Sequence, residues 1–369
     1  TAALTIFMRI KNGNAHYQDT MAWLVTGCGL LMPLMLFNAG FVMSVTGGLL
    51  IWAFGPYLQE KLRFLPRRIR RAAAVMVICA VFQLPLTAYY FNGVCIYGFL
   101  MPFIMGPLTI LALLIAPVTL AIMSIAGDAF ILKAYLDMIL LAMIKLPHLI
   151  NSLPLSKLII PTPSPAAMAA AALAVAAVYY YIKKKNTKLM LSSAAAFGFC
   201  AAAVASSLMR IGTAEFTFVN VGQGDGAVIR SYMGDTILID GGGGSSFSEY
   251  DPGEAVFVPF LESKGYSVIE AAFVSHYHKD HVQGIIAAID RLNVKNVFVP
   301  PRESCIDEDM AGWADEIERT AAENGTAVHY ISEDTRIRFM SGITLTVHVP
   351  VSAVSVSDDG NDTSLLIKA

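Results

Sequence analysis

Four side chains of the kinds that bind metal ions fall within six consecutive positions of the chain. They are His276, His278, Asp280 and His281, in the stretch "SHYHKDHVQG". Neutral imidazoles and a carboxylate suit Zn²⁺ or Mn²⁺. On a tight loop we expect the first two histidines to share one metal position. The aspartate and last histidine would then face a second position, roughly 3.5 to 4 Å away, as in two-metal hydrolases. The alternative, surface histidines on a polar loop, suits one histidine better than three with an aspartate.

An aspartate elsewhere in the chain is a further candidate for the same site. Asp240 ends an apolar run in "TILIDGGG", and the glycines after it permit a close approach of the backbone to a site. Alone, Asp240 would be interpreted as a turn residue. Beside the histidine cluster, we expect it to orient a ligand histidine or a metal-bound water. Asp240 and Asp280 are therefore the candidate catalytic residues.

The elements that must position these residues follow one another after about residue 214. Short apolar strands separated by glycine turns are expected at 215–221, 226–232 and 235–240, which together form a β-meander. Helical spacing is expected at 251–265, 281–293 and 310–325, and further strands at 268–275, 294–300, 326–332, 336–340 and 343–350. The histidine cluster thus lies where a strand ends and a helix starts, a frequent place for catalytic loops.

The composition divides the chain into two domains. Of its 369 residues 56% are hydrophobic and 15% are charged, and the mean hydropathy is +0.59, which is too apolar for an ordinary soluble protein. Residues 1–214 carry 16 Lys and Arg against 4 Asp and Glu, whereas residues 215–369 carry 10 against 24. We therefore expect a basic membrane domain at 1–210 and an acidic soluble domain at 215–369. The five cysteines show no paired spacing, which disfavours a disulfide framework or a cysteine zinc site.

Seven apolar stretches approach the roughly 20 residues that a membrane-spanning helix needs. They are 21–37, 40–58, 72–91, 99–126, 129–146, 166–182 and 189–209. Pro102, Pro107 and Pro117 interrupt the fourth stretch. That stretch is either a span with simple proline kinks, which we favour, or two broken half-helices.

Two basic loops indicate the orientation in the membrane. Lys and Arg accumulate on the cytoplasmic side, and they cluster at 60–71 and 183–188. Placing the first loop inside and counting spans puts the second loop inside as well. The Pro- and Ser-rich linker 151–165 and the acidic domain then lie outside the cell or in the periplasm.

The cluster resembles the signature of a known fold family. The pattern His276-x-His278-x-Asp280-His281, with Gly284 and a preceding Asp240, resembles the metallo-β-lactamase fold, an αββα sandwich. The resemblance implies that the first two histidines bind one metal ion and that Asp280 and His281 bind a second. Two divalent ions, Zn or Mn, are the expected cofactors.

Flanking motifs narrow the resemblance to the ComEC family, bacterial inner-membrane channels for DNA uptake. The stretches "FTFVNVGQGDGAVIR", "TILIDGGG" and "NDTSLLIK" are similar to the metallo-β-lactamase domain of that family. They add Asp225, Asn361 and Ser364 as residues that contact substrate or support the metal ligands. In the membrane half, "FNAGFVMSVTGGLL" and "QLPLTAYYFNGVCIYGFL" resemble the competence region of the family.

The sequence departs from the family pattern at several points. Gly226 stands where serine is usual, and small residues are more typical at Tyr277 and Lys279. The Gly-Asp and His-His-Gly-Ser segments that complete the family's metal site do not follow "NDTSLL", and an amino-terminal OB-like domain is not found. His329 and His348 are expected to be ordinary strand histidines rather than substitutes. We therefore expect a fragment, truncated at its C-terminus, with an incomplete active site, and its activity as an enzyme is left open.

The resemblance implies a function in natural transformation. The membrane domain would carry single-stranded DNA inward, and the outer domain would hydrolyse the other strand. DNA, the cell membrane, a DNA receptor and a cytoplasmic motor ATPase are the implied partners, and homo-oligomerisation is left open. The acidic charge opposes DNA binding, although Lys279, Arg291 and Lys295 could form a local basic patch. The alternatives are a transporter or exporter of another substrate and a membrane-anchored metallo-hydrolase of small esters or lactones.

Overall fold

The computed structural model describes most of the chain. The described residues are 17–99, 101–127, 130–153, 156–184, a few positions between 188 and 198, 214–244, 250–350 and 360–369. The expected seventh span, 189–209, falls almost entirely outside them. The chain divides into two compact units, one of Thr1–Leu158 with Pro163–Val204 and one of Ile159–Thr162 with Ala205–Ala369.

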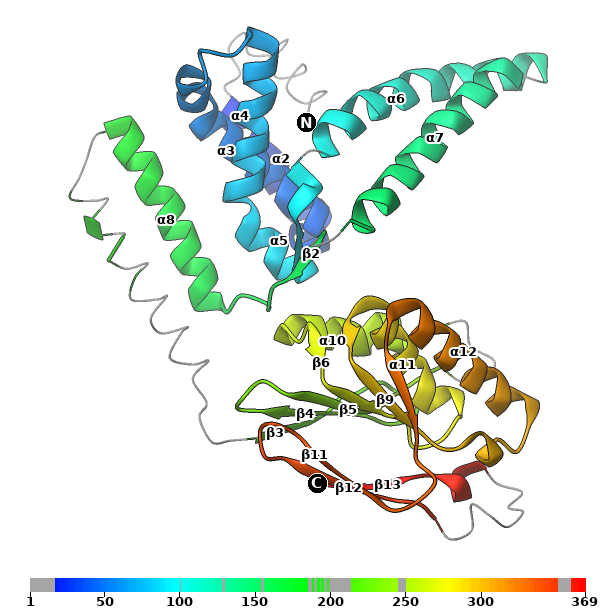
Figure 1. Cartoon of the computed structure of the whole chain (residues 1–369). Coiled ribbons are helices and arrows are strands. Elements are labelled where there is room, and N and C mark those ends of the chain that lie inside the picture. Colours follow the sequence, from blue (N-terminus) through cyan, green and yellow to red (C-terminus); the bar gives the residue numbers. More distant parts are fainter. Residues whose placement is uncertain are drawn as a thin grey trace. The chain divides into compact units, whose positions relative to one another are not determined.

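The first unit is built almost entirely of helices. Its elements are α2 (Tyr17–Leu31), η1 (Pro33–Phe37), α3 (Ala39–Lys61), α4 (Arg67–Phe82), α5 (Leu84–Phe91), β1 (Gly93–Cys95), η2 (Ile96–Phe99), α6 (Met101–Ala126), α7 (Phe130–Asn151), β2 (Lys157–Ile159) and α8 (Pro165–Lys184). Strands β1 and β2 pair in a small sheet. Helices α6 and α7 lie side by side as a long hairpin (Figure 1).

Among the described residues, α3, α6 and α8 are long and apolar enough to cross a membrane. A fourth span is added if the bent pair of α4 and α5 counts as one. Helix α7 has 22 residues but contains Lys133, Asp137 and Lys145, and it is not among these candidate spans. Because most side chains of these helices are exposed, their apolar surfaces suit a lipid environment.

A sharp bend lies in the third expected stretch and not in the fourth. Helix α6 continues from Met101 to Ala126 with Pro107 and Pro117 inside it, so the favoured interpretation of a helix that continues through its prolines is correct. Helices α4 and α5, by contrast, meet at 55° at Gln83. The side chain of Gln83 is buried there, and its Nε2 donates to the Met43 carbonyl of α3 at 2.6 Å. This contact ties the bend to the neighbouring helix.

In its described residues, the second unit contains sheets of six, three and two strands, three α-helices and three shorter helical segments. Its strands are β3 (Ala214–Phe218), β4 (Gly226–Ser231), β5 (Thr236–Gly241), β6 (Val268–Ile269), β7 (Ala271–Phe273), β8 (Asn293–Val294), β9 (Asn296–Val299), β10 (Ala327–Tyr330), β11 (Thr335–Arg338), β12 (Thr344–His348) and β13 (Leu366–Lys368). Its helices are η3 (Gly253–Phe257), α10 (Val258–Lys264), α11 (Lys279–Arg291), η4 (Arg302–Ser304), α12 (Glu308–Asn324) and η6 (Gly360–Thr363).

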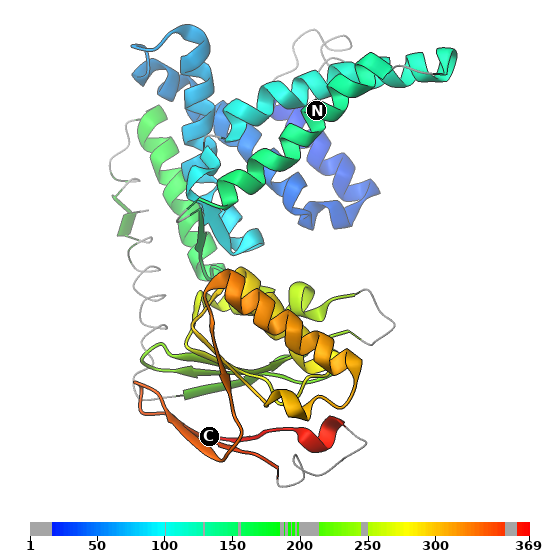
Figure 2. The ribbon, with the colours of Figure 1, turned by 45° about the vertical axis from the view of Figure 1, so that its right-hand side comes forward.

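The main sheet has six strands in the order β10-β9-β7-β5-β4-β3. Strands β10, β9, β7 and β5 run parallel, and β4 and β3 complete the expected meander in antiparallel pairing. A second, three-stranded antiparallel sheet has the order β11-β12-β13. Helices α10, α11 and α12 cover one face of the main sheet, and the three-stranded sheet covers the other (Figures 1 and 2).

Two hydrophobic cores hold these layers together. The first lies between the main sheet and the helices and includes Leu238, Ala272, Ile285 and Ile289. The second lies between the two sheets and includes Ile237, Phe273 and Leu345. Neighbouring residues of one strand, such as Ile237 and Leu238, thus serve opposite cores, as the alternation of strand side chains requires. The prediction of an α/β sandwich is therefore confirmed, with helix, sheet and sheet layers in the described residues.

Several expected elements differ from the structure. The strands expected at 268–275 and 294–300 are each divided in two, because β6 pairs with β8 while β7 and β9 enter the main sheet. The helix expected from His281 begins at Lys279. Asp280 and His281 consequently lie in the first turn of a helix and not on a loop.

Candidate metal centre at the sheet edge

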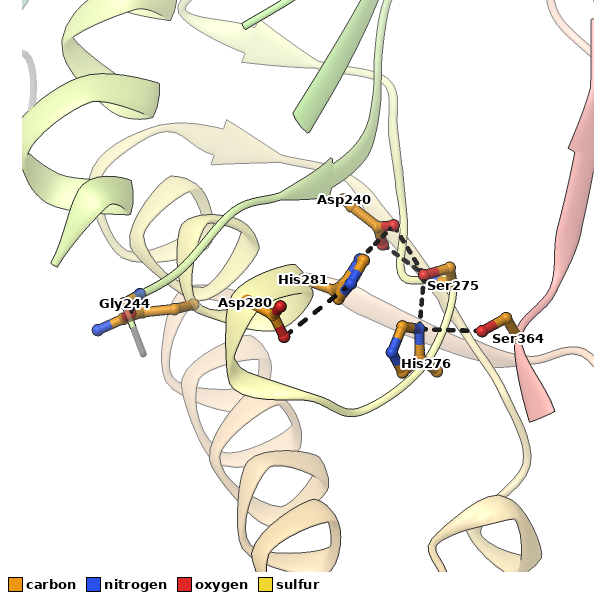
Figure 3. Close-up of polar contacts among 8 residues, drawn as sticks. Asp240, Gly244, Ser275, His276, Asp280, His281 and Ser364 are labelled. Carbon is orange, nitrogen blue, oxygen red and sulfur yellow. Dashed lines mark hydrogen bonds and ion pairs between the residues drawn. The ribbon is translucent and has the colours of Figure 1, made fainter. Parts of the chain in front are cut away.

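Asp240 joins the three segments that form the site. It is the last residue but one of β5, is 4% exposed, and has a φ of 52°, in the left-handed region that is uncommon for residues other than glycine. Its Oδ1 accepts a hydrogen bond from the Ser275 backbone N–H and its Oδ2 accepts one from the Ser275 hydroxyl, both at 2.7 Å. The same Oδ2 lies 3.0 Å from Nδ1 of His281 (Figure 3). The carboxylate thus fixes both the loop after β7 and the start of α11.

His281 presents its second nitrogen toward Asp280. With Nδ1 held by Asp240, Nε2 lies 4.0 Å from an Asp280 carboxylate oxygen. Burial lowers the pKa of His281, but the hydrogen bond and charge of Asp240, with the charges of Asp280 and Asp225, outweigh burial and raise it. Asp280 also lies in the first turn of α11, where a carboxylate interacts favourably with the helix dipole.

His276 is the most deeply buried histidine of the cluster, at 3% exposure. Its Nδ1 lies 3.0 Å from the Ser275 hydroxyl oxygen and 3.1 Å from that of Ser364 (Figure 3). Since the Ser275 hydroxyl donates its only hydrogen to Asp240, the imidazole N–H is placed on Nδ1 and donates to Ser275. The lone pair of Nε2 remains, and this buried atom has no hydrogen-bond partner among the described residues.

The electrostatic surroundings of His276 keep it neutral. Burial, together with the neighbouring charges of His281 and His278, lowers its pKa to about 4 against the smaller opposing effects of Asp240 and Asp280. A neutral imidazole is the form that binds a metal ion. His276 therefore offers a ready donor atom at neutral pH.

His278 completes the cluster at the N-terminal cap of α11. Its side chain makes no capping hydrogen bond, and its ring lies perpendicular to that of His276 with 4.8 Å between the ring centres. The ring centres of His281 and His276 are 4.2 Å apart. The three histidines predicted as ligands are therefore brought together.

The cluster contains side chains of the types that bind metal ions. The buried Nε2 of His276, which has no hydrogen-bond partner among the described residues, is an atom that a metal ion would satisfy. However, no group of three His, Cys, Asp or Glu side chains converges on one point among the described residues. The cluster thus fits a metal ion in chemistry, and the arrangement around two ions stays a prediction.

The remaining candidates line a cleft beside the cluster. The cleft has a volume of about 650 Å³ and is bounded by Asp225, Asp240, His276, His281, Asn361 and Ser364 together with apolar residues of both sheets. The Asp225 carbonyl accepts the Gly242 N–H at 2.7 Å. Ser364 reaches His276 as described, and the next N–H, of Leu365, donates to the Ser275 carbonyl at 2.9 Å. The stretch at 361–368 is thereby joined to the loop that carries the histidines.

Sequence reasoning missed the role of Ser275 and the reason for Gly284. Ser275 links Asp240 to His276, and the only signal for it was its place between strand and cluster. A Cβ on Gly284 would lie 1.9 Å from the Gly241 carbonyl oxygen, so α11 can approach the end of β5 only because both residues are glycines. This close approach brings His281 within reach of Asp240.

Two departures from the family pattern have structural reasons. A Cβ on Gly226 would lie 3.2 Å from the Phe257 ring and 3.3 Å from Val221, so a serine would be tight. Tyr277 is 1% exposed and points into the core, where its hydroxyl donates to the Pro300 carbonyl at 2.7 Å. Neither residue displaces a candidate ligand.

The two other histidines of this unit have partners outside the cluster. His329 lies on β10, stacks on Phe298 and is 3.0 Å from Asn296, while His348 lies on β12 and is 2.7 Å from Asp334. Both are strand histidines, as expected. Lys295 and Arg291, expected in a basic patch, form ion pairs with Glu270 and with Glu254 and Glu262.

The fold and the cluster together define the class of protein. It is a membrane protein whose helical region is joined to an α/β sandwich domain with a His and Asp cluster at the edge of its main sheet. The model of the family described as "Competence protein" matches residues 1–185, which is half of the chain. The chain belongs to this family, and the predicted resemblance is confirmed.

Two individual proteins are similar to parts of the chain. ComE operon protein 3 of Bacillus subtilis (strain 168) is 28% identical over 96 residues, which cover 23% of this chain and 12% of that protein. The chain therefore spans only a small part of the length of this relative. A metallo-beta-lactamase from Pontibacter korlensis matches 37% of this chain and 54% of its own chain, with 18% identity and a TM-score of 0.21. The fold described above rests on the sheet order and layers, and not on this weak likeness.

Proposed function

We propose that this chain acts in DNA uptake, as a membrane channel for single-stranded DNA whose sandwich domain hydrolyses the other strand. The observation that carries the proposal is the presence of a competence region and the Asp240-supported histidine cluster in one chain. Natural transformation is the process to which such an activity belongs. A DNA receptor, a motor ATPase and other copies of the chain remain proposed partners.

Divalent metal ions would be held by His276, His278, Asp280 and His281. When bound, such ions activate water as a nucleophile and neutralise charge on a phosphodiester. The chain contributes the positioning: Ser275 and Ser364 hold Nδ1 of His276, and Asp240 holds Nδ1 of His281. These contacts fix both ring orientations and leave each Nε2 for another partner.

The charge of the cleft supports a requirement for metal ions in DNA binding. Its described lining contains no Lys or Arg, and Asp225 and Asp240 add negative charge. Phosphate groups would therefore be repelled unless cations were present. Bound divalent ions resolve the conflict between an acidic domain and a DNA substrate.

We propose that the sandwich domain lies outside the cytoplasm. The two basic loops lie on the same side of the membrane if α7, despite its three charged residues, crosses the membrane beside α6. The hairpin that α6 and α7 form supports such a crossing. A cysteine introduced at the exposed Ser332, in a variant whose five native cysteines are replaced by serine, checks this placement. Labelling of intact cells by a membrane-impermeant maleimide supports it, whereas labelling only after lysis contradicts it.

The nuclease activity is tested with the full chain in detergent. Linear duplex DNA labelled on one strand is incubated with the protein and Mn²⁺ or Zn²⁺. We expect metal-dependent cleavage that is lost in the double variant His278→Ala, Asp280→Ala. The matched control is the double variant Asp334→Asn, His348→Ala, which removes an exposed Asp–His pair outside the cluster and should remain active. No cleavage by wild-type protein with metal bound overturns the nuclease proposal.

A further inference from the structure

The cleft beside the cluster has an apolar end that the proposed chemistry does not use. Phe218 of β3 and Leu366 of β13 both line the cleft that also contains His276 and His281. Phe218 is 86% exposed and Leu366 is 67% exposed. Single exposed apolar residues are common on protein surfaces. Two from different sheets at one cleft beside a candidate active site indicate a binding surface.

An apolar row of side chains connects Phe218 to the cluster. Phe218 pairs with Ala227 on β4, and Ala227 pairs with Ile239 on β5. Cross-strand partners point to the same face of a sheet, so the three side chains form one row. Ile239 directly precedes Asp240, and all three members of the row line the cleft. A ligand with its charged part at the cluster would place its neighbouring group along this row.

Among the described residues, the position of β3 explains why Phe218 is exposed. The row that contains Phe218 points toward the three-stranded sheet. Ile229 points the same way and belongs to the core between the two sheets. Strand β3 is at the edge of the main sheet, and the phenyl ring remains exposed there. The ring therefore offers an open flat face.

The charge of the cleft determines which ligand group suits this end. With no Lys or Arg in its described lining, the protein itself offers little attraction for phosphate groups. Stacking of a base on an aromatic side chain supplies about 1–3 kcal/mol without requiring any charge. A cleft of about 650 Å³ has the size of ordinary small-ligand sites, which span roughly 300 to 1,000 Å³.

We infer that Phe218 and Leu366 bind the nucleobase adjacent to the phosphodiester that faces the histidine cluster. The inference rests on the proposed function and names the group that the site recognises, an unpaired base of a DNA strand. The base stacks on Phe218 and contacts Leu366, and the row through Ala227 and Ile239 leads toward its phosphate. Phe218 is accordingly a positioning residue for the substrate and takes no part in proton transfer.

Binding to two short oligonucleotides tests the inference. The probes are a fluorescent hexathymidylate and a hexamer of abasic residues with the same number of phosphates, both with cleavage-resistant phosphorothioate links. Binding is measured by anisotropy with the full chain in detergent and Mn²⁺. We expect the wild type to prefer the base-bearing probe. The Phe218→Ala variant should weaken that binding by about 5- to 150-fold and leave the abasic probe unchanged.

Two further variants separate stacking from a structural effect. Phe218→Trp retains an aromatic face and should preserve the preference for bases. Phe216→Ala removes the other exposed phenylalanine of β3, which is 55% exposed and does not line the cleft, and should alter binding less than twofold. In the nuclease assay, Phe218→Ala should raise KM with little change in kcat.

The outcomes distinguish this inference from the proposed function. Metal-dependent cleavage with equal binding of both probes, or with no effect of Phe218→Ala, overturns the base site and leaves the nuclease intact. Equal weakening of both probes by Phe218→Ala also overturns it. If the wild type neither binds nor cleaves DNA while hydrolysing a small ester, both the nuclease proposal and the base site are wrong.

Discussion

Oδ2 of Asp240 lies 3.0 Å from Nδ1 of His281, across a junction of strand and helix that spans 41 positions of sequence. A carboxylate in this position selects the imidazole tautomer and fixes the ring, so that Nε2 is the atom left for a metal ion. The same carboxylate binds the backbone and hydroxyl of Ser275, next to His276. One side chain therefore orients two candidate ligands.

Replacing Asp240 with Asn should weaken metal binding more than it weakens folding. Asn tolerates the left-handed backbone of this position and retains hydrogen bonds, but it lacks the negative charge that holds His281. We expect an affinity for Zn²⁺ lower by about 10- to 100-fold, measured by calorimetric titration. Asp334→Asn, at the exposed pair with His348, is the control and should retain wild-type affinity. Equal affinities of Asp240→Asn and wild type would contradict the assigned role.

The contact between Gly284 and Gly241 should be intolerant of any side chain. Gly284→Ala places a Cβ against backbone, 1.9 Å from the Gly241 carbonyl oxygen, and the helix must move away. We expect a loss of at least about 1–3 kcal/mol in the free energy of unfolding, with weaker metal binding because His281 moves from Asp240. Gly312→Ala in α12, where a Cβ meets nothing within 4 Å, should be neutral or stabilising. Similar melting temperatures of the two variants would show that the junction is not tight.

The sequence predicted which residues come together better than it predicted their arrangement. Alternating apolar strands and the spacing of the histidines were sufficient to place Asp240 and the cluster at strand ends. The start of α11 at Lys279 was not predicted, because "HYHKDH" has no apolar periodicity and the cap at His278 makes no side-chain hydrogen bond. The division of 268–275 into two strands depends on pairing partners distant in sequence, which local pattern does not contain.

In the membrane half, the bend at Gln83 was not predicted, although the sequence contains a local signal for it. Pro85 lies in the first turn of α5, directly after the break, and proline disfavours a helix that continues through the preceding residues. The prolines of the fourth stretch do not have this effect, since α6 continues through them. The contact of Gln83 with Met43, 40 residues away, has no signal in the hydropathy of the stretch.

The contact between Gln83 and α3 should be detectable as a coupling with Gly47. A Cβ on Gly47 would lie 2.6 Å from Nε2 of Gln83, so Gly47→Ala displaces the amide from the Met43 carbonyl. We expect a cost of about 0.5–1.5 kcal/mol for the lost hydrogen bond, seen as a lower melting temperature in detergent. In a Gln83→Ala background the same change should cost nothing. Gly106→Ala in α6 is the unhindered control, and equal costs in both backgrounds would refute the coupling.

Tyr277 should affect folding without affecting the metal site. Tyr277→Phe removes the donor to the Pro300 carbonyl inside the core and leaves that acceptor unsatisfied, at a cost of about 1–3 kcal/mol. Because its side chain points away from its histidine neighbours, affinity for Zn²⁺ at temperatures well below unfolding should equal that of the wild type. Chemical denaturation and metal titration of the same preparation check the two effects. A loss of affinity without a loss of stability would contradict this description.

The central claim is that the histidine cluster holds a divalent metal ion, and X-ray absorption at the zinc edge tests it most directly. The full chain is loaded with one equivalent of Zn²⁺ after removal of adventitious metal. We predict a spectrum with the outer-shell scattering of at least two imidazole ligands, which is reduced in His276→Ala and unchanged in His348→Ala. A wild-type spectrum without imidazole scattering, or one that His276→Ala leaves unaltered, would contradict the claim.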